Sequence, residues 1–138
     1  MGRVGALTRS VAVFDIDLPP GVSFMRSLGR AGAPVRAFSA DRKAAGRSSR
    51  FAGIVRPCPP VRRTDEFVAF LAEGLTDGSI DLVAPTSDYV CFGVAAAVAK
   101  VGIDSGTVGH PPAERVLTAL FKARFHLAAE RFGFPVPP

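Results

Sequence analysis

The chain has 138 residues, a length that fits one compact domain. Apolar residues make up 48% and charged residues 21%, which is typical of a folded globular protein and excludes a low-complexity chain. No apolar run approaches the roughly 20 residues that a membrane-spanning helix needs. We therefore expect no membrane partner.

Basic residues are concentrated in the first half of the chain. Residues 1–63 hold 12 Lys and Arg against three Asp, whereas residues 64–138 hold five against nine Asp and Glu. A basic half can indicate nucleic-acid binding, but these arginines are scattered and no aromatic-rich motif lies among them. We expect a solvated basic face, or attraction for small anions, and no nucleic-acid partner.

The start of the chain and the two cysteines bear on location. Met1–Ser10 contains two arginines, but no long apolar segment follows, which speaks against a secretory signal. Cys58 and Cys91 lack the spacing of metal ligands and are expected to be free thiols. We predict a cytoplasmic protein with no metal site in this chain, a flexible leader over 1–10 and one domain over 11–138.

Strands and helices alternate in the first half of the sequence. The run Val-Ala-Val-Phe-Asp-Ile is β-rich and apolar, and Leu18-Pro19-Pro20-Gly21 ends it. A helix is then predicted, because Val22, Met25 and Leu28 form one apolar face. A polar, basic loop over 41–50 separates the next two strands. The predicted elements are strand 11–16, helix 22–31, strand 34–39 and strand 53–58.

The second half continues the alternation. Thr64 is the expected N-cap of a helix that Gly78 ends, with Asp65 and Glu66 in its first turn. A later helix is apolar nearly all round, which indicates burial between neighbours, or against a second copy of the chain. The last helix has an apolar stripe of Leu117, Phe121, Phe125, Ala128 and Phe132. The predicted elements are strand 80–84, helix 89–101, a very short fifth strand at Thr107-Val108 and helix 113–132.

This alternation predicts a three-layer, Rossmann-like α/β fold. We expect a parallel sheet of four or five strands in the order 3-2-1-4-5, with helices on both faces. Ligands of such sheets bind beyond the carboxyl ends of the strands, where the strand order reverses. Here that position lies between the first and fourth strands.

Two polar loops are expected to meet at this position, 15–21 and 85–88. Each precedes a helix N-terminus, where free N–H groups can bind anions. We predict that the substrate-binding residues are Asp15, Asp17, Gly21, Thr86, Ser87 and Asp88. The residues of the second loop could equally cap the helix that follows.

Asp15 and Asp17 also allow a different interpretation. An Asp-x-Asp at a strand end is found in Mg²⁺-dependent phosphatases that use an aspartyl nucleophile. Those proteins continue with a small hydroxyl or Gly-Thr turn, whereas Leu18-Pro19-Pro20 follows here. The simpler interpretation is a strand-end pair of which one member caps a helix.

Several segments together resemble a known family. They are residues 26–35, Ser48-Ser49-Arg50-Phe51, Pro57–Pro60, Asp65-Glu66-Phe67, Pro85-Thr86-Ser87-Asp88, and the tail from Lys122 to Pro137. In their order and spacing, they resemble the pre-ATP-grasp domain, the N-terminal domain of carbamoyl-phosphate-synthase-like ATP-grasp ligases. The resemblance covers nearly everything from Val11 onward.

The resemblance implies a function and its cofactors. Family members use ATP and Mg²⁺ to join a carboxylate to an amine by way of an acylphosphate, and this domain forms one wall of the substrate site. It implies that a C-terminal ATP-grasp domain, expected beyond Pro138, is the partner that binds ATP and Mg²⁺. The chain alone is then a domain fragment that is not catalytic. A possible homodimer, a stand-alone small-anion binding module and the Asp-dependent phosphatase remain alternatives.

One functional position of the family maps onto this chain. An Asp-Lys pair before the tail helix supplies a lysine near the nucleotide phosphates. Lys122 matches that lysine, whereas Phe121 stands where the family has the aspartate. The resemblance therefore implies that Lys122 binds the cofactor, and the alternative is a solvated helix residue beside a core phenylalanine.

Overall fold

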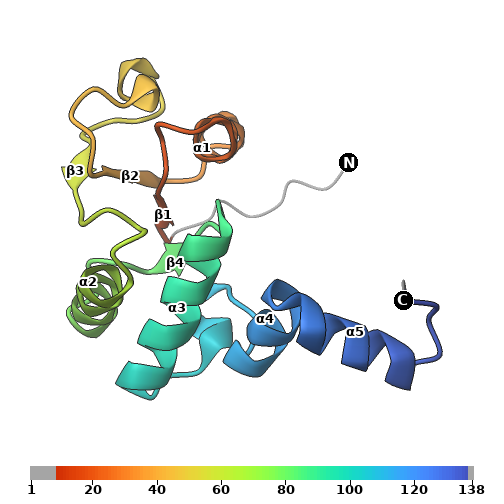
Figure 1. Ribbon diagram of the computed structural model, residues 1–138. Coiled ribbons are helices and arrows are strands. Elements are labelled where there is room, and N and C mark those ends of the chain that lie inside the picture. Colours follow the sequence, from red (N-terminus) through yellow and green to blue (C-terminus); the bar gives the residue numbers. More distant parts are fainter. Residues whose placement is uncertain (1–8, 137–138) are drawn as a thin grey trace.

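Four short parallel strands form the centre of the computed structural model, which describes residues 9–136 (Figure 1). They lie in the order β3-β2-β1-β4, and all three pairings are parallel. This confirms the predicted order of the first four strands. The strands are β1 Val11–Val13, β2 Val35–Ser39, β3 Arg56–Pro57 and β4 Leu82–Val83.

Helices connect the strands and extend the chain beyond the sheet. They are α1 Pro19–Arg30, α2 Thr64–Thr76, α3 Asp88–Val101, α4 Ala113–Leu120 and α5 Lys122–Arg131. Two short 3₁₀ helices lie between them, Ala45–Ser48 and Ser105–Val108. No described helix has both the length and the apolar character needed to cross a membrane.

The centre of the sheet is buried on both faces, as expected of parallel strands, whereas both residues of β3 at its edge are exposed. Successive residues of a strand point to opposite faces, so Ala12 joins one apolar cluster while Val11 and Val13 join the other. The first cluster lies against α2 and α3, and the second against α1. The expected three layers, with helices on both faces of a parallel sheet, are therefore present.

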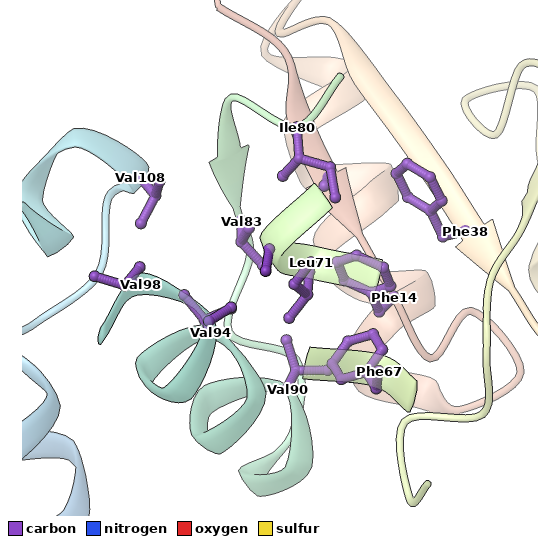
Figure 2. Packing of buried hydrophobic residues seen from close by; sticks show 13 residues of the cluster. Phe14, Phe38, Phe67, Leu71, Ile80, Val83, Val90, Val94, Val98 and Val108 are labelled. Atoms are coloured by element: carbon purple, nitrogen blue, oxygen red, sulfur yellow. The ribbon is translucent and has the colours of Figure 1, made fainter. Parts of the chain in front are cut away.

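Aromatic rings fill the first cluster (Figure 2). Phe14 is fully buried, stacks on Phe38 with ring centroids 5.0 Å apart, and meets Phe67 edge-on at 5.1 Å. Such pairs add about 0.5–1.5 kcal/mol beyond the burial of their area. Because Phe14 directly precedes Asp15, this packing anchors the end of β1.

The helices begin at different residues from those predicted. α1 starts at Pro19, because proline suits the first helical positions, where no N–H partner is needed. Pro19 and Pro20, which were expected to separate the strand from the helix, thus belong to the first turn of α1. Thr64 is the first residue of α2 and its side chain makes no capping hydrogen bond, so its prediction as the N-cap is wrong.

The fifth strand and the long last helix are not formed. Thr107 and Val108 belong to a 3₁₀ helix, and Val108 packs into the first apolar cluster. The predicted helix 113–132 is two helices, because Phe121 has an extended backbone (φ −94°, ψ 110°) and serves both as the C-cap of α4 and as the N-cap of α5.

The expected core stripe of the last helix is exposed instead of buried. Phe121, Phe125 and Phe132 are 51%, 55% and 81% exposed, and α5 contains no buried residue. α4 buries Val116 and lies between α3 and α5, so α5 extends away from the sheet (Figure 1). Helical periodicity identifies an apolar face, but it does not say whether the same domain covers that face.

The described structure begins within the predicted leader. Ser10 is buried, and its hydroxyl donates a hydrogen bond to Asp81 Oδ2 at 2.6 Å. Arg9 donates to the carbonyl oxygen of the same residue. The rest of the predicted leader, 1–8, lies outside the described residues, as do Pro137 and Pro138.

Candidate functional site

A cavity of about 420 Å³ lies at the carboxyl ends of the strands. The loops after β1, β2 and β3 and the first turn of α3 all contribute to its wall. Its described lining is Asp15, Asp17, Leu18, Ser39, Ala40, Asp41, Cys58, Pro59, Pro60, Val61, Arg62, Ser87, Asp88 and Tyr89. The cavity thus lies where the strand order reverses, the position predicted for a ligand site.

A hydrogen bond joins the two loops that were predicted to meet. Ser87 Oγ donates to Asp15 Oδ2 at 2.6 Å, although the residues are 72 positions apart in sequence. Ser87 is also the N-cap of α3, because its Oγ accepts from the backbone N–H of Val90 at 3.3 Å. The loop 85–88 was expected either to bind substrate or to cap the following helix. Ser87 caps α3, and it also lines the cavity.

Asp15 has an unusual backbone and an unusual charge environment. Its φ is +51°, in the left-handed region, where Asp and Asn are the commonest non-glycine residues. Burial raises the pKa of its carboxyl group, while the Ser87 hydrogen bond lowers it, Asp17 raises it and Arg62 lowers it. Burial therefore disfavours the charged form of the Asp15 carboxyl group, and such shifts are common in ligand sites.

The thiol in the cavity wall is protonated. Burial raises the pKa of Cys58 to about 12, and the nearby charges of Asp15 and Asp17 add to the increase. Burial and Asp88 raise the pKa of Cys91 as well. A thiol of this kind is a poor nucleophile, because only the thiolate reacts rapidly.

The remaining charged groups of the wall are not paired with one another. Asp17 and Asp88 are exposed, and neither accepts a hydrogen bond or forms an ion pair within residues 9–136. The carboxylate of Asp41 accepts, among the described residues, only from the backbone N–H of Lys43, at 2.8 Å. Arg62, the one cationic residue among the described lining, lies over the ring of Tyr89 at 5.6 Å.

The cavity does not have the donors of a magnesium or nucleotide site. No group of three or more His, Cys, Asp or Glu within the described part of the chain could hold a metal ion. The wall combines four aspartates with a single arginine, which does not suit a triphosphate. The residues present therefore do not fit the triphosphate of ATP, and no cluster of three metal-ligating side chains among the described residues includes Asp15 and Asp17.

Three of the predicted site residues do not line the cavity. Gly21 is buried in the first turn of α1, where a Cβ would overlap the carbonyl oxygens of Phe14 and Asp15. Thr86 is buried, and its hydroxyl has no hydrogen-bond partner among the described residues. Lys122 is exposed at the first residue of α5. The structure thus brings together Asp15, Asp17, Ser87 and Asp88, and leaves Gly21, Thr86 and Lys122 outside.

Sequence reasoning missed the part of the wall that follows β2 and β3. Ser39, Asp41 and Arg62 lie there, with the apolar residues Pro59, Pro60 and Val61. A signal existed for Ser39 and Asp41, because Ser39 ends a predicted strand, Asp41 follows it, and parallel strands end at the same edge. The reversal of strand order points only to the loops that follow β1 and β4, so it does not identify the loops after β2 and β3.

A second, more apolar cavity lies at the far end of the chain. It has a volume of about 840 Å³ and lies between α4, α5 and the segment 134–136. Its wall includes Phe125, Phe132 and Phe134, which are all exposed. These side chains form an exposed apolar surface, here called the α4–α5 surface.

Comparisons with known proteins add no further constraint: no protein-family model, no curated protein and no solved structure matches this chain.

Proposed function

We propose that this chain is the substrate-side domain of an ATP-dependent carboxylate–amine ligase, of the pre-ATP-grasp type that the sequence resembles. The cavity at the carboxyl ends of the strands is its part of the substrate site. ATP and Mg²⁺ are bound by an ATP-grasp domain of the same protein, so the chain by itself does not catalyse the reaction.

The observation that carries this proposal is the Asp15–Ser87 hydrogen bond at the cavity. It fixes the loop after β1 against the first turn of α3, at the reversal of strand order. A rigid wall of this kind can position a substrate for reaction with a group that another domain holds. The order of the first four strands is the expected one and is compatible with this proposal.

The two alternatives from the sequence receive less support. A module for small anions is disfavoured by the charge of the cavity, because four of the five charged residues in the described wall are aspartates. An Asp-dependent phosphatase would need further metal ligands beside Asp15, and the described part of the chain supplies no such group.

The α4–α5 surface supports the proposed contact with a further domain. Exposed apolar patches that gather several aromatic side chains are typical of interaction sites. Lys122 lies in this segment, is exposed, and opens α5. In the proposed arrangement its ammonium group contacts nucleotide phosphates held by the neighbouring domain, and does not contact the cavity.

The test is an assay of the protein encoded by the gene, including any sequence that follows residue 138. We expect ADP formation that requires both a carboxylic acid and an amine, and none from residues 1–138 alone. Asp17→Asn should lower the amine-dependent rate, whereas Glu73→Gln, an exposed charge on α2 away from the cavity, should not. A gene that ends at residue 138, with no nucleotide-dependent activity in any complex of the chain, would reject the proposal.

A further inference from the structure

The wall of the cavity indicates the chemical class of its ligand. It carries four carboxylates against one guanidinium group, and this balance is opposite to the overall excess of basic residues. Clefts lined by one sign of charge concentrate ligands of the opposite sign. The local charge therefore favours a cation, although the whole chain would attract anions.

The carboxylates are available to a ligand. Asp17 and Asp88 make no hydrogen bond or ion pair within the described residues, and Asp15 uses one carboxylate oxygen for Ser87. Arg62 stands over Tyr89 and forms no ion pair with these aspartates. An ammonium group, with three N–H donors, could satisfy oxygens that come from both loops.

A metal cation is not the ligand that this wall fits. Divalent cations need several oxygen ligands around one point, at about 2.0–2.6 Å. No three acidic, histidine or cysteine side chains come together in this way between residues 9 and 136. Separated carboxylates suit an organic cation, whose charge and hydrogen-bond donors can lie at one end of a larger body.

Part of the cavity wall is apolar. Leu18, Pro59, Pro60 and Val61 line it, and the ring of Tyr89 adds to it. A volume of about 420 Å³ accommodates a ligand of the size of an aromatic amine or amino acid. The wall thus combines a carboxylate end with an apolar side.

We propose that the cavity binds the amine substrate of the ligase, as a small protonated amine with an apolar body. Its ammonium group pairs with the carboxylates of Asp17 and Asp88, which have no partner among the described residues, and its apolar part lies along Pro59, Pro60 and Val61. This assignment rests on the proposed function and specifies which half of the reaction the domain serves. The carboxylate that is activated by ATP is then held elsewhere in the complete protein.

The experiment compares three probes that share an apolar body and differ in charge: 2-phenylethylamine, L-phenylalanine and 3-phenylpropanoate. Binding to residues 1–138 is measured by ¹H–¹⁵N chemical-shift titration at pH 7. We expect the amine and the amino acid to shift the backbone amides of 15–18, Cys58, Val61, Arg62 and 87–89. The carboxylate probe should bind at least about fivefold more weakly, because exposed ion pairs contribute modestly.

Matched variants test the contacts. Asp17→Asn and Asp88→Asn should each weaken binding of 2-phenylethylamine by about two- to fivefold. Glu73→Gln removes the same charge from an exposed site outside the cavity and should leave the affinity unchanged. Equal weakening by all three variants would show a general charge effect and would overturn the assignment.

The outcomes separate this inference from the proposed function. Tighter binding of 3-phenylpropanoate at the same amides would overturn the amine assignment and leave a substrate site for the carboxylate half. No shift at these amides with any probe, in a chain whose spectrum shows it to be folded, would overturn both.

Discussion

Asp15 and Ser87 are 72 residues apart in sequence, and their side chains are joined by a hydrogen bond of 2.6 Å. The contact exists because β1 and β4 are parallel neighbours in the sheet, so the residues that follow them lie at one edge. It links the capping of α3 to the shape of the cavity. A change at either residue is therefore expected to affect both stability and binding.

Ser87→Ala should destabilise the chain by about 1–2 kcal/mol, because it removes the N-cap of α3 and the partner of Asp15. Ser87→Thr retains a hydroxyl and should cost less than half as much. Urea denaturation followed by circular dichroism measures both. An alanine variant as stable as the parent chain would contradict the role given to this hydroxyl.

Asp15→Asn should leave the chain at least as stable at pH 7. Asparagine tolerates a positive φ and can still accept from Ser87, while the buried charge is removed. The raised pKa gives a pH test. From about pH 4, the ordinary pKa of an aspartate, up to the raised pKa of folded Asp15, the folded chain binds more protons than the unfolded one.

The contribution of Asp15 to stability therefore falls as pH rises through that window. Asp15→Asn should remove this decline when the free energy of unfolding is measured by urea titration from pH 4 to pH 7. Glu73→Gln is the comparison, since Glu73 is exposed on α2 and does not line the cavity. A steeper decline in the Asp15 variant than in the parent would show that the sign is wrong.

Phe14→Ala should cost about 3–5 kcal/mol, because the ring is fully buried between Phe38 and Phe67. Phe132→Ala removes the same group from a side chain that is 81% exposed and should change the free energy of unfolding by less than about 0.5 kcal/mol. Thermal or chemical denaturation measures the loss of stability in each variant. Similar losses in the two variants would refute the assignment of Phe14 to the core.

Cys58 should react slowly with iodoacetamide at pH 8 in the folded chain. With its pKa raised to about 12, only about one thiol in ten thousand is ionised at that pH. Alkylation followed by mass spectrometry should show rates at least about a hundredfold higher in denaturant. Asp17→Asn should accelerate the reaction modestly, since burial is the larger cause. A native rate equal to the denatured rate would contradict the buried, protonated thiol.

The sequence was sufficient for the arrangement of the sheet and for part of the site. Apolar β-rich runs alternate with amphipathic ones, and the rule for parallel sheets predicts that the loops 15–21 and 85–88, which contain Asp15 and Ser87, meet. Asp17 and Asp88 line the same cavity. These residues could be predicted because their positions follow from strand order alone.

The remainder depended on tertiary packing. Pro19 and Pro20 suit either a loop or the first turn of a helix, and only the fit of Gly21 against the end of β1 distinguishes these. Helical periodicity continued through Phe121, where one extended residue divides the helix. Arg62 entered the cavity through the short β3–α2 loop, whose path the local sequence does not determine.

The most direct test of the account blocks the cavity in the complete protein. Ala40 is exposed in the cavity wall, and Ala69 is exposed on α2 away from it, so each can be changed to cysteine and labelled with a bulky maleimide. The account predicts that labelled Ala40→Cys loses at least about tenfold of its amine-dependent ADP formation, the effect of losing substrate positioning. Unlabelled Ala40→Cys and labelled Ala69→Cys should keep it. Full activity of the labelled Ala40 variant would contradict the claim that the substrate binds in this cavity.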